Sequence, residues 1–115
     1  QPQVGRVYYP GLPGDPGHAL ARAQMQDFGC VLALDIAGGA AAAARFCEAL
    51  KLFGMAASFG ATESLALPPQ LLFPGDLSAG EKALAGVGPG LVRLSIGLED
   101  EGDLRADLAQ ALRAC

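Results

Sequence analysis

The segment from Cys30 to Leu50 constrains the fold most, because its apolar pattern changes from that of a strand to that of a helix. Its first part, CVLALDI, is a nearly continuous apolar run flanked by glycines, which predicts a strand covered on both faces and central in its sheet. Gly38 and Gly39 then open AAAAARFCEALKLF, whose alanine content predicts a helix. The helical spacing of its apolar residues gives one face with Ala43, Phe46, Cys47 and Leu50. A strand followed directly by a helix indicates a mixed α/β domain.

The flanking segments predict shorter elements. Before Cys30, an extended VGRVYYP stretch and a turn rich in proline and glycine lead to a helix predicted from Pro16 to Asp27, with Asp15 as its N-cap. After Leu50, residues 53–59 and 63–67 are short strand candidates separated by a Gly-Ala-Thr turn. The proline-rich LPPQLLFPGD segment that follows is expected to be irregular.

The C-terminal part predicts a helix, a strand and a second helix. Residues 78–85 read as a short helix, with Ser78 as N-cap and Glu81 completing a capping box. After the strand, Asp100 is expected to cap the last helix, and acids in the first turn complement the helix dipole. The apolar face of that helix repeats every four residues, at Leu104, Leu108 and Leu112. The sum is an α/β (α+β) two-layer sandwich, in which helices cover a small, mainly antiparallel sheet, and residues 1–115 form one domain.

Bulk composition excludes several classes of partner. The net charge of −4 and the pI near 4.7 argue against a nucleic-acid surface or an anionic membrane surface. No apolar run is long enough to span a bilayer, and no targeting segment is visible. The three cysteines are far apart, so neither a metal site nor a disulfide framework follows, and Cys30 and Cys47 are expected to be small buried side chains. The predicted location is a reducing cytoplasm.

An arginine interrupts the apolar strand LVRLSIGL. With a period of two, one face of this strand is core, with Val92, Leu94, Ile96 and Leu98. The opposite face carries Leu91, Arg93, Ser95 and Gly97. Because Ser95 and Gly97 are small, that face suits a pocket wall, and an arginine in a pocket requires an anion. The alternative is an arginine on a solvent-facing surface.

The rest of the chain offers little for catalysis. His18, the one histidine, falls in the first turn of a predicted helix and is interpreted as a solvated or capping residue. Ser58, Glu63 and Ser64 are polar candidates, but no Ser/His/Asp set, metal spacing or carboxylate pair can be assembled. The glycines at 86–90 precede a strand, which does not suit a phosphate loop. These residues predict a binding domain more readily than a reacting one.

Three stretches, taken together, resemble a known family. RVYYPGLPGDPGH at 6–18, LFGMAASFGATESL at 52–65 and GLVRLSIGLEDEGDLRADLAQAL at 90–112 are similar, in order and spacing, to the C-terminal domain of the cystathionine and methionine metabolism enzymes. These enzymes use pyridoxal 5′-phosphate and include cystathionine β-lyase, γ-lyase and γ-synthase, methionine γ-lyase and the O-acylhomoserine sulfhydrylases. The resemblance implies the C-terminal domain fold of fold-type I enzymes, and a homo-oligomer for the full-length protein.

The resemblance also implies roles for four residues. Arg93 would clamp the α-carboxylate of the amino-acid substrate, since a guanidinium fork matches a carboxylate with two parallel hydrogen bonds. The Ser58 hydroxyl and the backbone amide of Phe59 would assist this clamp. Glu63 would face the distal end of the substrate, or else make a structural hydrogen bond or carry a surface charge.

Departures from the family pattern leave the substrate open. Ala61 replaces a glycine of the S-[LW]-G-G turn, and the P-A-x-M-T-H segment of many γ-acting members is missing. That absence, with aromatic Phe59 where β-lyases commonly have tryptophan, favours a carbon–sulfur lyase similar to cystathionine β-lyase. The YYPGLP opening favours the γ-acting group instead, so a γ-synthase, γ-lyase or sulfhydrylase stays open.

The catalytic lysine of the family has no counterpart here. The chain contains Lys51 and Lys82 alone, and neither lies in a sequence like the family's cofactor-binding motif. The resemblance therefore implies that a preceding large domain binds pyridoxal phosphate, and that residues 1–115 alone are inactive, with no catalytic or cofactor-binding residue among them. A free-standing domain kept for amino-acid binding or dimerisation is the alternative.

Overall fold

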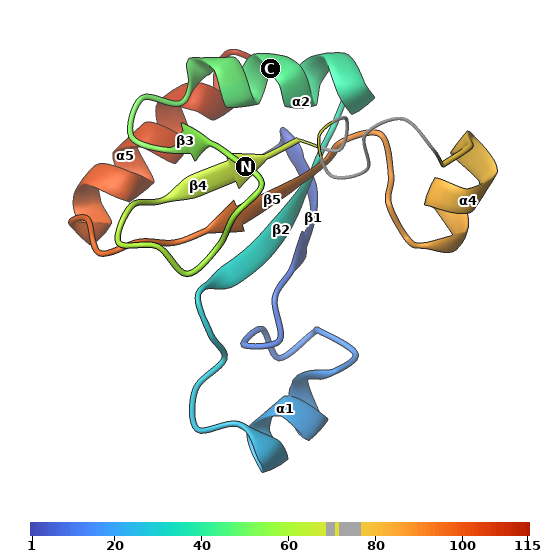
Figure 1. Ribbon diagram of the computed structural model, residues 1–115, viewed down its shortest axis with the longest axis vertical. Helices are drawn as coiled ribbons and strands as arrows, with labels where there is room; N and C mark the ends of the chain where they lie inside the picture. The colour runs from blue at the N-terminus through green and yellow to red at the C-terminus, as the bar shows by residue number, and fades with distance from the viewer. Residues whose placement is uncertain (69–70, 72–76) are drawn as a thin grey trace.

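The structure is a computed structural model of the chain, and it describes residues 1–68, 71 and 77–115 (Figure 1). Five strands form one sheet in the order β1-β2-β5-β4-β3. Their bounds are Val4–Tyr8 (β1), Val31–Ile36 (β2), Gly54–Met55 (β3), Leu65–Leu67 (β4) and Leu91–Ser95 (β5). All neighbouring pairs are antiparallel except β3 and β4. The predicted small, mainly antiparallel sheet is confirmed.

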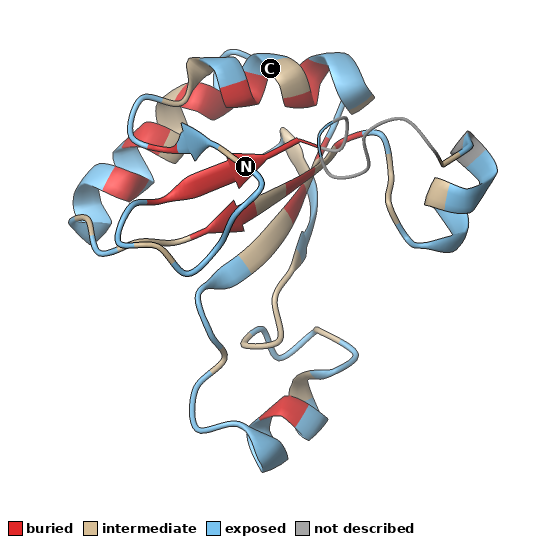
Figure 2. Cartoon of the chain, viewed as in Figure 1, coloured by how far each residue is buried: buried red, intermediate tan, exposed pale blue. Residues whose placement is uncertain are grey.

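Two of the four helices in the described residues cover one face of this sheet. The helices are His18–Gln24 (α1), Gly39–Ala49 (α2), Ala79–Leu84 (α4) and Glu101–Leu112 (α5). Figure 1 shows α2 and α5 together on one side of the sheet, while α1 and α4 project from it. Buried residues gather between α2, α5 and the strands (Figure 2). The core there includes Ile36, Phe46, Val92, Leu94 and Leu112. The predicted two-layer α/β architecture is confirmed.

The strand at Val31–Ile36 is covered on one face. It lies between β1 and β5, so it is interior, although β5 holds the centre of the sheet. Leu34 and Ile36 are buried, whereas Ala33 and Asp35 are half-buried. The prediction of cover on both faces was therefore wrong, because both helices of the sandwich pack on the same side.

Local signals placed several helix ends correctly. Ser78 and Glu81 form the predicted capping box, and the Asp100 side chain accepts hydrogen bonds from the backbone of Gly102 and Asp103. The N-cap predicted at Asp15 was wrong. Its carboxylate accepts the N–H of Gly17 at 2.8 Å and so forms a tight turn. Because residues 15–17 belong to this turn, α1 begins only at His18.

The cysteines divide between two environments. Cys47 is buried, as predicted, and burial raises the pKa of its thiol to about 11, with smaller contributions from Cys115 and Glu48. Cys30 is exposed, so the prediction that it is buried was wrong; it lies just before β2, whose first residue Val31 is exposed as well. The segment expected to be irregular, 67–76, lies largely outside the described residues.

The excursion that contains α1, residues 9–29, is held together by contacts of aromatic side chains. Tyr9 donates its hydroxyl to the carbonyl of Gly29 at 2.9 Å, which closes the base of this excursion. His18 stacks on Phe28 with ring centroids 5.4 Å apart, and its Nδ1 lies 2.7 Å from the carbonyl oxygen of Pro10. His18 is thus a structural residue of this excursion. None of the helices in the described ranges is long and apolar enough to cross a membrane.

Candidate functional site

Arg93 lies on the sheet face opposite the helices. Val92 and Leu94, its neighbours in β5, are fully buried in the helix-covered core, as the alternation predicted. Across the sheet, Arg93 is paired with Ala33 of β2 and Leu67 of β4. The alternation does not extend to Leu98, which is exposed, because the strand ends at Ser95.

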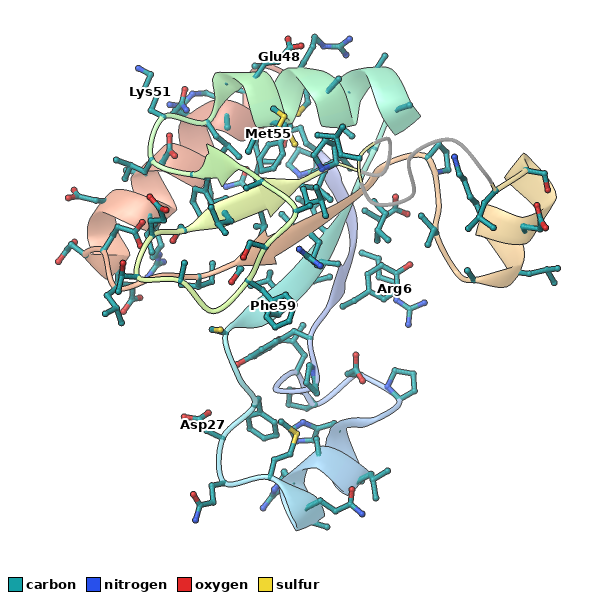
Figure 3. All side chains as sticks on the ribbon, viewed as in Figure 1. Arg6, Asp27, Glu48, Lys51, Met55 and Phe59 are labelled. Carbon is teal, nitrogen blue, oxygen red and sulfur yellow. The ribbon has the colours of Figure 1, made fainter. Side chains whose placement is uncertain are left out.

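The segment between β3 and β4 contributes two of the predicted site residues. Arg93 donates from Nη2 to the carbonyl oxygen of Ser58 at 2.8 Å. The Arg93 guanidinium carbon also lies 5.7 Å from the centroid of the Phe59 ring, within the range of a cation–π contact. Figure 3 shows Phe59 on the side of the sheet away from Glu48, which lies on α2. The structure therefore brings Arg93, Ser58 and Phe59 together on the open face.

Residues 58–64 are not held by the backbone hydrogen bonds of a β-ladder. Beyond the Ser58 contact, the N–H of Gly60 donates to Ser95 Oγ at 3.0 Å, and the N–H of Ser64 donates to Glu99. Each of these pairs, like Arg93 with Ser58, is separated by 35 residues. Because the residue numbers rise together in these three pairs, residues 58–64 run in the same direction as residues 93–99, although the bond between Gly97 and Ser64 joins residues 33 apart. This explains why the strand predicted at 53–59 is reduced to Gly54–Met55.

Ser64 and Glu99 form the far end of this arrangement. Ser64 is fully buried, donates its hydroxyl to Glu99 Oε2 at 2.8 Å and accepts the N–H of Gly97 at 2.8 Å. The backbone N–H of Ser64, that of Glu99 itself and the Ser64 hydroxyl all stabilise the charged carboxylate, which lowers the pKa of Glu99. Gly97 has no room for a side chain, because an added carbon would lie 2.5 Å from the carbonyl oxygen of Thr62.

The sequence reasoning missed Glu99. Its place beside Asp100 and Glu101 suggested one acidic cluster at a helix start, but only Asp100 caps α5. The available signal was that Glu99 precedes the N-cap and so belongs to the strand extension.

Glu63 is not joined to Arg93. Its side chain is exposed, and within the described ranges it makes no hydrogen bond or ion pair. Its main chain passes close to Gly97 instead, where an added side-chain carbon would meet the Glu63 carbonyl carbon at 2.6 Å.

A hollow of about 720 Å³ borders the same segment but does not include Arg93. Gly60 and Ala61 line one side of it, and Ile96 and Leu98 contribute apolar surface. Asp27 is its one charged lining residue. Because the one charged residue of its lining is an acid, the hollow offers no positive partner to an anion, and it is a largely apolar recess beside the segment.

Neither lysine lies at Arg93. Lys51 is exposed, and its backbone N–H donates to Asp107 of α5, on the helix-covered side (Figure 3). Lys82 lies in the last turn of α4. Among the described residues, no contact joins a lysine to Arg93.

Together, the fold and the site define a small α/β domain in which an arginine of β5 is anchored to the segment between β3 and β4. The chain belongs to the family of Cys/Met metabolism PLP-dependent enzymes, whose model matches residues 1–113.

Several similar proteins carry the names of enzymes that act on homoserine derivatives, methionine or cystathionine. The chain is 43% identical over 114 residues to O-succinylhomoserine sulfhydrylase of Pseudomonas aeruginosa, covering 99% of this chain and 28% of that protein. It is 47% identical over 114 residues to L-methionine gamma-lyase of Pseudomonas putida, covering 99% of this chain and 29% of that protein. The structure of cystathionine gamma synthase from Xanthomonas oryzae pv. oryzae in complex with cystathionine matches with a TM-score of 0.91 and 40% identity, covering 99% of this chain and 30% of that one. The chain thus spans less than a third of the length of these relatives.

Proposed function

We propose that this chain is the C-terminal domain of a PLP-dependent trans-sulfuration enzyme, in which it binds the α-carboxylate of an amino-acid substrate. Family membership and the short span of the chain along its relatives support this proposal. A large domain elsewhere in the longer protein would bind the cofactor, since Lys51 and Lys82 lie away from Arg93. The observation that carries the proposal is the anchored guanidinium on the open face of the sheet.

Arg93 would hold the carboxylate through the part of its fork that faces away from Ser58. One nitrogen, Nη2, already donates to the Ser58 carbonyl, which restricts how the guanidinium can rotate. The remaining N–H groups can donate to two carboxylate oxygens in parallel, a geometry that lysine cannot provide. The exposed Phe59 ring lies beside the guanidinium and would shield this pairing from water.

The same segment offers further groups to the substrate. The Ser58 hydroxyl and the Phe59 N–H are proposed as additional donors to the carboxylate, because both sit next to the carbonyl that Arg93 binds. Glu63 is proposed to meet the distal end of the substrate, and its exposed carboxylate is also consistent with a plain surface charge. When bound, pyridoxal phosphate stabilises the carbanion formed at Cα. A carboxylate fixed at Arg93 would orient the Cα–H bond for proton loss.

For the reaction itself, we propose chemistry at the γ-carbon. The names of the relatives support it, since they include a sulfhydrylase, γ-lyases and γ-synthases. Cystathionine β-lyase chemistry is the second candidate, because Phe59 is aromatic where β-lyases commonly carry tryptophan. Incubation of the full-length protein with cystathionine distinguishes the two, because γ-elimination releases 2-oxobutyrate and β-elimination releases pyruvate.

The assembly and the location of the whole enzyme are proposals as well. The family resemblance supports a homo-oligomer, which sedimentation of the full-length protein would measure. The free cysteines Cys30, Cys47 and Cys115 are in keeping with a reducing cytoplasm.

Replacement of Arg93 tests the proposed function. In the full-length enzyme, we expect Arg93→Ala to raise the KM for the amino-acid substrate by at least roughly tenfold, because two charge-assisted hydrogen bonds are lost. The cofactor absorbance band should persist, and Arg22→Ala, which removes an exposed arginine of α1, should leave KM unchanged. A KM that does not respond to Arg93→Ala would refute the assignment.

A further inference from the structure

The segment that presents Ser58 and Phe59 lacks strand or helix bonding of its own. From Ser58 to Ser64 the chain has no regular secondary structure, and side chains 35 residues ahead hold it at three points. The first point is Arg93 itself and the second is the Ser95 hydroxyl. The third point is Ser64 with Glu99, where the anchoring side chain is a carboxylate.

Glu99 fixes Ser64 with both carboxylate oxygens. Oε1 accepts the backbone N–H of Ser64 at 2.6 Å, and Oε2 accepts its hydroxyl at 2.8 Å. The hydroxyl oxygen in turn accepts the N–H of Gly97. Next to it, the N–H of Leu98 donates to the carbonyl of Thr62 at 2.8 Å. Each bond joins the segment to the extension of β5, so movement of Ser64 along β5 would break several bonds at once.

We propose that Glu99 is a positioning residue, which holds Ser64 and thereby sets the register of residues 58–64 against β5, with the Ser58 carbonyl at Arg93. This inference rests on the proposed function and deepens it. The three contacts that join residues 35 apart support it, because a slip of the segment by one residue would move Ser58 away from the guanidinium.

The hydrogen-bond inventory explains why a carboxylate is needed at this position. Ser64 presents an N–H and an O–H to residue 99, so residue 99 must accept twice. Glutamine can accept only with its amide oxygen, and its NH₂ group would put a donor where the Ser64 hydroxyl now finds an acceptor. Alanine accepts nothing. We therefore expect Glu99→Gln to lose part of the hydrogen bonding to Ser64 and Glu99→Ala to lose all of it.

A double-mutant cycle in the full-length enzyme tests the inference. Glu99→Ala should lower kcat/KM for the amino-acid substrate by roughly tenfold, mostly through KM, and Glu99→Gln should lower it less. If Glu99 acts through Arg93, the double variant Glu99→Ala/Arg93→Ala should be no worse than Arg93→Ala alone, because the two effects share one interaction. Glu101→Ala is the matched control, since its exposed carboxylate contacts Arg105 one turn along α5.

The outcomes separate this inference from the proposed function. If Arg93→Ala leaves KM unchanged, the proposed function fails, and this inference fails with it. If Arg93→Ala raises KM while Glu99→Ala does not, or if the two effects multiply in the double variant, the positioning role is overturned and the proposed function survives. Should Glu99→Ala fold poorly, Glu99→Gln and Ser64→Ala replace it in the same cycle, with the same criteria.

Discussion

The two faces of the sheet are held together by different forces. On the helix-covered face, α2 and α5 bury Ile36, Phe46 and Leu94 in a continuous apolar core. On the open face, residues 58–64 are bound to β5 and its extension by hydrogen bonds between backbone groups and side chains. Apolar contacts are non-directional and tolerate small shifts, whereas each hydrogen bond specifies a position. The comparison teaches that stability and the geometry of the site have separate origins in this domain.

One buried polar group also serves the helix-covered face. Asp107 of α5 accepts the N–H groups of Lys51 and Leu52, at 3.0 and 2.8 Å, and the side-chain amide of Gln110. It thereby satisfies the backbone that leaves α2. This carboxylate joins the two helices in the same manner as Glu99 joins the site segment to β5.

The largest expected loss of stability comes from truncating a large side chain in the apolar core. Phe46→Ala should lower the free energy of unfolding by about 3–5 kcal/mol, since Phe46 is fully buried between α2 and the sheet. Equilibrium unfolding in urea measures it. Leu84→Ala is the control, because Leu84 of α4 is 90% exposed, and its effect should stay within about 0.5 kcal/mol. Equal losses from the two variants would contradict the described core.

The next effect is expected at Asp107 and depends on pH. Burial opposes its charge, but hydrogen bonds from Leu52, Lys51 and Gln110 outweigh burial and lower its pKa below the ordinary value of 3.8. Asp107→Asn should cost roughly 1.5–3 kcal/mol at neutral pH, because bonds to a charged acceptor are weakened.

The stability that Asp107 contributes should be fully present above its unfolded pKa and should disappear as pH falls through the lower folded value. The gap between wild type and Asp107→Asn, followed by urea unfolding, should therefore narrow below about pH 3.8. Asp103→Asn, at an exposed site in the same helix, should cost less than about 1 kcal/mol. A gap that is constant with pH would argue against a charged Asp107 in the folded state.

The smallest expected effect on stability comes from the open face. Gly97→Ala would place a carbon 2.6 Å from both the Glu63 backbone and Glu99 Oε2, so the site segment must shift, at a cost of roughly 1–3 kcal/mol. Gly14→Ala meets nothing within 4 Å and should be near neutral. Thermal unfolding compares the two. If Gly97→Ala matched Gly14→Ala, the tight contact between the segment and β5 would be disproved.

Much of the helix-covered layer could be predicted from the sequence. Alanine propensity and apolar spacing predicted α2, and side-chain caps predicted the starts of α4 and α5. Each of these signals acts over three or four residues. The start of α1 was predicted wrongly, because an aspartate can either cap a helix or close a tight turn, and the local sequence does not decide between them. In the structure Asp15 accepts the N–H of Gly17 in a turn.

The candidate site could be predicted only in part. The alternation in LVRLS identified Arg93 as the unusual residue, and resemblance to a family, not spacing, brought in Ser58 and Phe59. Glu99 was overlooked, because its partner Ser64 is 35 residues away and nothing in the local pattern specifies that pairing. The exposure of Cys30 was also missed, because the local sequence does not show that the start of β2 lies outside the apolar core.

The sequence by itself determined the class of fold, the main helices and the arginine that interrupts a core strand. These properties depend on propensity, periodicity and capping, which act between near neighbours in the chain. Tertiary structure alone decided which face of the sheet stays open, where β3 ends and how residues 58–64 align with residues 93–99. Those outcomes depend on contacts between segments that are distant in the sequence. Such contacts form only when the sheet assembles and the helices pack on one of its two faces.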